Sequence, residues 1–251
     1  MKQKINELLN IIEKLKKNDI PKDEFYGYLK NIDSFYENPE LEYQLLLSNG
    51  LPLEIIDEKV RLKTKTTSIQ DQKFCIVDIE TNGSKVQNGQ IIELAAIKIK
   101  NGQIIDSYES LVYAKEIPEF IQEVTNITPY MLKSAPTLKD VLFEFKIFLE
   151  DCVFVAHDIK FDYNFISNSL ELYNYGKLEN RKLCTIDLAK RTIKSDKYGL
   201  VTLKELLNID IATHHRAYSD ALSTKLIFDK CLKNLPAHVV TVEDLIGFSK
   251  S

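Results

Sequence analysis

The stretch from Phe74 to Gly83, FCIVDIETNG, constrains the fold more than any other part of this sequence. Its apolar run is typical of a buried strand, and it ends in two acidic residues, Asp78 and Glu80, that are separated by one residue. Because side chains alternate across a strand, both carboxylates point to the same face of the sheet. Two like charges on one face repel each other unless one takes up a proton or a cation lies between them.

The residues before this stretch predict a separate, mainly helical domain over residues 1–68. An apolar stripe at helical spacing opens it, and Pro21 and Pro39 mark the starts of two further helices. The basic segment KVRLKTKTTSI, residues 59–69, alternates and predicts a short hairpin or a linker. Helices followed by a basic β-wing would resemble a winged helix, which binds nucleic acid or protein; a plain helical docking domain is the alternative.

Residues 69–251 predict an α/β domain with a mixed sheet flanked by helices. Three antiparallel strands come first, and Asn101-Gly102, a strong hairpin signal, joins the second to the third. Helical segments follow, then the short buried strand CVFVAH, a strand that runs into a helix in RKLCTIDLAKRTI, and a long helix from Ala217. Thr202 is expected to cap a short helix before it.

Composition narrows the class of protein. The chain has 251 residues and a net charge of −4, so it does not bind polyanions in bulk, although a site that holds divalent cations would bring its own positive charge. Its four cysteines are scattered without a Cys-x-x-Cys pair, which argues for buried reduced thiols and against zinc. No apolar run approaches the roughly 20 residues of a membrane helix. We therefore expect a cytoplasmic protein without membrane contact.

Two further acids complete a candidate metal site with Asp78 and Glu80. Asp162 and Asp220 each lie where a predicted helix starts, and helix N-termini favour negative charge. Four carboxylates without a thiol suit Mg²⁺ or Mn²⁺, and two such ions roughly 3.5–4 Å apart form the arrangement used for displacement at phosphorus. His215 precedes Asp220 by five residues, and histidine is the residue type that most often acts as a general base, so it is the candidate for that role.

Three segments resemble the exonuclease motifs of the DEDD superfamily, which has a ribonuclease H-like fold. VDIETNG resembles its Asp-x-Glu-Thr motif, AHDIKFD its second motif, and HRAYSDA the His-x-Ala-x-x-Asp motif of the DEDDh branch. From about Phe74 to Leu232 the chain is similar to the proofreading epsilon subunits of bacterial DNA polymerase III. The resemblance implies that the same four acids hold two metal ions and that His215 is the base, with its neighbour His214 a loop residue.

The resemblance also implies contacts with the substrate. Thr81 would lie beside the 3′-terminal nucleotide, and His157 and Phe161 would line the site, although Phe161 could instead be core packing. Asp158 stands where the family often has Asn, so substrate contact at this position is in doubt; its alternative role is to cap the following helix. Asn126 replaces a common Gly, and Asn tolerates the left-handed backbone region.

The implied activity is that of a 3′→5′ exonuclease that releases nucleoside monophosphates from single-stranded or frayed DNA ends, in replication proofreading or repair. Residues 1–68 would recruit a partner such as the replicative polymerase, or the protein would act alone. Trimming of RNA 3′ ends is an alternative that the catalytic residues do not exclude. A third reading, an inactive polymerase-associated scaffold, conflicts with the intact motif acids and His215.

Overall fold

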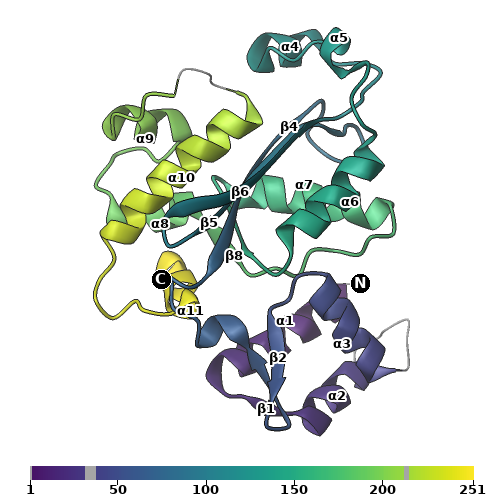
Figure 1. Ribbon diagram of the computed structural model, residues 1–251, viewed down its shortest axis with the longest axis vertical. Helices are drawn as coiled ribbons and strands as arrows, with labels where there is room; N and C mark the ends of the chain where they lie inside the picture. The colour runs from purple at the N-terminus through teal and green to yellow at the C-terminus, as the bar shows by residue number, and fades with distance from the viewer. Residues whose placement is uncertain (1, 32–37, 212–214) are drawn as a thin grey trace.

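The computed structural model describes residues 2–31, 38–211 and 215–251, and two separate β-sheets organise them (Figure 1). The first sheet has three strands in the order β1-β3-β2, all antiparallel. The elements of this part are α1 (Lys2–Lys17), β1 (Ile20–Pro21), α2 (Lys22–Asn31), α3 (Pro39–Ser48), β2 (Leu53–Ile56), β3 (Lys59–Leu62) and the 3₁₀ helix η1 (Lys63–Lys65).

The N-terminal part has its own apolar core, in which helices α1 and α2 pack against the small sheet. Leu15 and Phe25 are fully buried there, whereas Leu9, a member of the predicted stripe, is 52% exposed. The hairpin lies earlier than the sequence predicted: its first strand is β2, its turn is Asp57–Glu58 with positive φ at both residues, and β3 is its second strand. A hairpin follows three helices, as the winged-helix pattern requires.

The larger sheet has five strands in the order β6-β5-β4-β7-β8. Its strands are β4 (Lys73–Thr81), β5 (Ile91–Lys100), β6 (Gln103–Leu111), β7 (Val153–Ala156) and β8 (Lys182–Cys184). Strands β4, β5 and β6 are antiparallel, and β7 and β8 run parallel to β4. Asn101 and Gly102 make the predicted turn between β5 and β6, with φ of 50° and 72°.

Helices cover both faces of this sheet (Figure 1). They are α4 (Glu119–Thr125), α5 (Pro129–Leu132), α6 (Leu138–Leu149), α7 (Ile159–Leu172), α8 (Thr185–Thr192), α9 (Leu200–Leu206), α10 (Ala217–Lys233) and α11 (Val242–Lys250). Cys75 and Val77 of β4 face α6 and α7, whereas Phe74 and Ile76 face α8, α10 and α11. A mixed sheet between helices is the ribonuclease H-like architecture that the sequence predicted.

Two features at the C-terminal side differ from the prediction. Helix α11 was not predicted; Thr241 and Asp244 begin it with a capping box, in which each side chain accepts from the other residue's backbone N–H. Thr202 does not cap α9, because the helix already begins after Gly199 and Thr202 lies inside it. The start of α9 therefore does not depend on a capping side chain at Thr202.

Polar contacts join the N-terminal part to the larger sheet's domain. The backbone C=O of Asn49 accepts from Glu179 N–H at 2.7 Å, and its side chain accepts from Lys146 at 2.8 Å. Lys63 pairs with Asp151, which lies two residues before β7. Because β7 runs parallel to β4, these contacts lie at the end of the sheet where β4 begins. Asp78 lies toward the other end of β4.

Two further expectations concern the burial of the cysteines and helices that could cross a membrane. Cys75, Cys152 and Cys231 are buried free thiols, as predicted, and Cys184 is half-buried. Among the described residues, no helix combines the length and apolar character that crossing a membrane requires.

Candidate active site

The end of β4 supplies the first two acids. Asp78 and Glu80 alternate with the buried Ile79, so both carboxylates lie on the face of β4 that α10 covers. Glu80 lies directly opposite Glu93 of β5, and a bulge follows between Glu80 and Thr81. The regular ladder therefore ends at the acids, which leaves the strand end open to groups from other elements.

Helix α7 brings the third acid to this strand end. Strand β7 pairs with β4 only as far as Ile76, and beyond that point the backbone N–H of Ile79 favours the charged form of the Asp162 carboxylate. Asp162 lies in the first turn of α7, where the helix dipole favours a negative charge, and it is only 4% exposed. The prediction that Asp162 starts a helix beside the strand end is confirmed.

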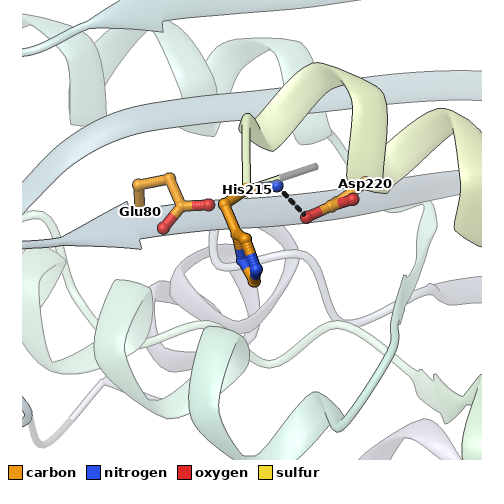
Figure 2. Close-up of side chains that lie close together, drawn as sticks. All are labelled: Glu80, His215 and Asp220. Atoms are coloured by element: carbon orange, nitrogen blue, oxygen red, sulfur yellow. Dashed lines mark hydrogen bonds between the residues drawn. The ribbon is translucent and has the colours of Figure 1, made fainter. Parts of the chain in front are cut away.

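Helix α10 brings the fourth acid and the histidine. Asp220 lies in its first turn and is 7% exposed, and the backbone N–H of His215 donates to its carboxylate at 3.2 Å. Glu80 and Asp220 lie on either side of His215 (Figure 2). The ligand atoms of these three residues all lie within 4.8 Å of one another. Segments distant in the sequence thus meet at one point.

The electrostatics of the cluster call for a cation. Burial raises the pKa of Asp78 well above its usual value, and the charges of Asp162, Glu80 and Asp220 raise it further. Burial and the charge of Asp220 raise the pKa of Glu80 to about 8. Burial likewise raises the pKa of Asp162 to about 7, against the opposing effect of its N–H donors. Burial and mutual repulsion therefore favour the protonated form of these carboxyls in the metal-free cluster.

The donors fit a hard divalent cation. Carboxylate oxygens from four residues, with one imidazole nearby and no thiolate among the described residues of the cluster, match the ligands that Mg²⁺ and Mn²⁺ prefer. A bound cation would offset the mutual repulsion that raises these pKa values. The site therefore has the chemistry of an acidic divalent-metal centre.

The three predicted substrate residues have different surroundings. Thr81 is half-buried beside the acids, and its hydroxyl donates to Gly83 C=O at 2.9 Å. Phe161 is 41% exposed and contacts the ring of Phe165, so it is not a core residue. His157 uses both ring nitrogens within the protein, toward the Thr185 hydroxyl at 2.8 Å and Tyr198 C=O at 2.9 Å.

The two positions that depart from the family pattern both adopt left-handed backbone. Asn126 has φ of 56° at the end of α4, as its residue type predicted. Asp158 has φ of 67° before α7 and its side chain makes no capping hydrogen bond, so the capping alternative is wrong. Asp158 is exposed, and its charge contributes to the raised pKa of Asp162. His214 lies outside the described residues.

Sequence reasoning missed an ion pair that borders the site. Glu93 is buried in β5 and pairs with Arg216, the residue after His215, at 2.6 Å. The available signal was a lone acid in the strand QIIELAAIKIK, which is buried almost throughout, since buried acids are rare unless they are paired. Arg216 also lowers the pKa of Glu80, in opposition to the carboxylates around it.

Comparison with known proteins assigns this arrangement. The family model for exonucleases of the RNase T type matches residues 75–228, which include all four acids and His215. The chain belongs to this exonuclease family. The family match covers β4 through most of α10, so the acidic cluster lies within the part of the chain that the family model describes.

Relatives and solved structures of this exonuclease domain agree. The chain is 36% identical over 197 residues to DNA polymerase III PolC-type of Staphylococcus haemolyticus, covering 76% of this chain and 14% of that protein. It is 37% identical over 196 residues to the Staphylococcus saprophyticus protein of the same name, covering 77% and 13%. The chain thus spans about one seventh of the length of these curated relatives.

Two solved structures share the fold. Exonuclease I of E. coli, in complex with a dA16 oligonucleotide, superposes with a TM-score of 0.56 at 16% identity, covering 65% of this chain and 41% of that one. Exonuclease X, in complex with 5′ overhanging duplex DNA, superposes with a TM-score of 0.51 at 22% identity, covering 70% and 99%. These likenesses confirm the ribonuclease H-like architecture of the exonuclease domain.

Removing metal should make the stability of this domain fall as the pH rises. Glu80 and Asp162 have pKa values raised from 4.5 to about 8 and from 3.8 to about 7. Between the unfolded and folded pKa values the folded state holds more protons, so the free energy of unfolding decreases with rising pH. In EDTA the melting temperature, measured relative to an Asp162→Asn variant, should fall between about pH 4 and pH 7, the window set by Asp162.

Added Mn²⁺ should reverse this loss, with a larger rise in melting temperature at pH 8 than at pH 5, because protons compete with the cation at low pH. Scanning fluorimetry across the pH range measures both effects. A melting temperature that stays parallel to that of Asp162→Asn throughout, or an equal Mn²⁺ effect at both pH values, would contradict the raised pKa values.

Proposed function

We propose that this protein is a 3′→5′ exonuclease that hydrolyses single-stranded or frayed DNA ends to nucleoside monophosphates, in replication proofreading or repair. The observation that carries the proposal is the meeting of Glu80, Asp220 and His215 within 4.8 Å at the end of β4, beside Asp78 and Asp162. The relatives named above are DNA polymerases, which favours DNA over RNA as the substrate. A cytoplasmic location follows from such a role.

The residues take distinct roles in this proposal. Asp78, Glu80, Asp162 and Asp220 would hold two divalent cations, Mg²⁺ or Mn²⁺. Bound divalent cations supply a nucleophile at neutral pH and stabilise the charge on the leaving 3′ oxygen. His215 is exposed and next to the acids, so its imidazole can reach solvent and accept a proton from the attacking water.

Single-stranded ends fit the surroundings of the acids. Phe161 presents a partly exposed ring in the turn that carries Asp162, where an unstacked base can pack on it. Thr81 follows Asp78 and Glu80 on the same strand, and in this proposal it contacts the last nucleotide. A frayed end reaches such a site more easily than a paired one, because unpairing a base costs free energy.

Matched oligonucleotides test the substrate. We expect a 5′-labelled single-stranded DNA to shorten stepwise from its 3′ end in Mg²⁺, faster than the RNA of the same sequence, and a duplex with a mismatched 3′ end faster than the matched duplex. A 3′-phosphate on the same DNA is the matched control for direction. Faster trimming of the RNA would make the protein an exoribonuclease, and labelled product released from the 5′ end would refute the direction.

For residues 1–68 we propose recruitment of a protein partner, with the replicative DNA polymerase as the first candidate. The alternative is nucleic-acid binding by the hairpin β2–β3, the wing. The net charge of this part of the chain gives that alternative less support. Residues 1–68 carry eleven Lys and Arg against twelve Asp and Glu. Three basic side chains of this segment are also paired with acids: Arg61 and Lys65 with Asp19, and Lys63 with Asp151.

We place the boundary of the catalytic domain near residue 63, somewhat before the 68 that composition suggested. Val242 N–H donates to Thr67 C=O at 3.1 Å, and Ser68 forms a bridge with Thr241. The fully buried Thr64 donates to Glu243 at 2.7 Å. Residues 63–68 therefore support α11, which packs against α8 and β8 of the larger sheet.

Two truncations test both proposals. A chain of residues 63–251 should hydrolyse short oligonucleotides within about twofold of the full rate, because distant sites act independently. In a pull-down experiment the full chain should retain the replicative polymerase, whereas residues 63–251 should not. A chain of residues 69–251 is the matched comparison and should melt at a lower temperature, since it lacks Thr64 and Thr67. Loss of activity from 63–251 would show that the N-terminal part belongs to the active fold.

A further inference from the structure

The buried acid Glu93 holds the start of α10 from a neighbouring strand. Its side chain is 1% exposed and accepts from Arg216 Nη2 at 2.6 Å and from Arg216 Nε at 3.0 Å. It also accepts from the backbone N–H of Ala217 at 2.9 Å. Arg216 precedes α10 and its side chain makes no local cap, and the carboxylate from β5 instead accepts from the first backbone N–H of the helix.

This pairing fixes the residue that follows His215, and Asp220 fixes His215 itself. His215 has a left-handed backbone with φ of 56°, a conformation that L-residues adopt only when their surroundings hold it. Its N–H donates to Asp220, and the next residue is anchored by the bidentate bonds to Glu93. The backbone on both sides of the imidazole is therefore attached to rigid elements, β5 and α10.

Charge supports the same conclusion. Glu93 lies directly opposite Glu80 in the sheet, so it would be a fifth acid on the face that carries the cluster. Arg216 neutralises Glu93 and also attracts Glu80. A planar guanidinium with two parallel bonds does this in one orientation only, unlike a lysine. The pair thus holds the Glu93 carboxylate against Arg216 and Ala217 and sets the direction in which α10 starts.

We propose that Glu93 and Arg216 are positioning residues for hydrolysis: their ion pair holds His215 in place beside Glu80. The kinetic part of this inference rests on the proposed exonuclease function, whereas the placement of His215 does not. Glu93 acts through His215, so its contribution to the rate disappears when the imidazole is absent.

A double-mutant cycle tests the kinetic part in the full-length protein. Glu93→Gln keeps the shape and one acceptor but removes the charge, and we expect kcat on single-stranded DNA to fall by on the order of 10²-fold with KM little changed. In the His215→Ala background the same change should alter kcat by less than about twofold. Glu109→Gln, an exposed acid on β6 near Arg216, is the charge-matched control and should keep the wild-type rate. Equal losses in both backgrounds would reduce the pair to a structural role and overturn the proposal.

Histidine resonances test the placement without reference to activity. In protein labelled at its four histidines, the imidazole signal of His215, assigned with His215→Ala, should shift and broaden in Glu93→Gln. The signals of His157 and His238 should stay unchanged. An unchanged His215 signal would overturn the proposal, and a shifted signal in a protein without hydrolysis would refute the proposed function alone. If Glu93→Gln does not fold, the same two measurements are made on Arg216→Lys, because Arg216 is the partly exposed member of the pair.

Discussion

Replacing Asp162 with asparagine should abolish hydrolysis and, in EDTA, raise the melting temperature. Asp162 is buried among acids that repel it, and burial already raises its pKa to about 7. The amide removes a charge that the metal-free fold tolerates poorly, with a gain of about 2–4 °C per kcal/mol recovered. It also removes a cation ligand worth several kcal/mol in the transition state, so the rate should fall by roughly 10³-fold or more. Scanning fluorimetry and single-turnover hydrolysis measure the two effects.

Asp187 provides the matched control for this substitution. It also lies in the first turn of a helix that follows a parallel strand, α8 after β8, but its side chain is half exposed and lies close to Lys190. Asp187→Asn should leave both the rate and the melting temperature near the wild-type values. A loss of stability in Asp162→Asn without metal would show that the acids do not repel one another as their environment indicates. Full activity in that variant would remove Asp162 from the metal site.

Replacing His215 with alanine should lower kcat by about 10²–10⁴-fold, the usual contribution of a general base, and leave KM nearly unchanged. The side chain is exposed, so the fold should persist, and circular dichroism and melting temperature should match the wild type. Rates should be followed as a function of pH, because loss of the base should remove the rise in rate that accompanies its deprotonation.

The exposed His238, in the loop before α11, is the control for this experiment. His238→Ala removes an imidazole of similar exposure far along the chain from the acids and should leave the pH profile unaltered. An unchanged rate in His215→Ala would exclude it as the base. A large loss of Mn²⁺ affinity in the same variant would instead make His215 a metal ligand, which its distance from Glu80 and Asp220 permits.

Much of the exonuclease domain was predictable because its signals are local. The alternating strand around Asp78 and the Asn101-Gly102 turn depend on residues adjacent in the chain, and both appear as predicted. Asn126 likewise adopts the left-handed conformation that its own side chain favours. The acids near helix starts follow the same logic, since a helix dipole acts within the first turn.

The small sheet and α11 were harder to predict because their stability comes from distant partners. Strand β1 has two residues and forms only by pairing with β3, nearly forty positions later in the chain. The Asp57–Glu58 turn uses residues that seldom take positive φ, so it carries no Asn-Gly signal. Helix α11 begins with a capping box, but its place is decided by packing against α8 and by the bond from Thr64 to Glu243.

By itself, the sequence singled out the residues that we propose to carry the chemistry: two acids one position apart at a strand end, two more at helix starts, and a histidine before the last. Residue type and spacing suffice for this, because period-two alternation and helix N-termini are local properties. Only the tertiary structure showed that a buried glutamate of β5 and an arginine beside His215 form an ion pair next to these residues. Their contact joins residues 123 positions apart, and such a contact arises from the register of β5 and the packing of α10, which no local pattern specifies.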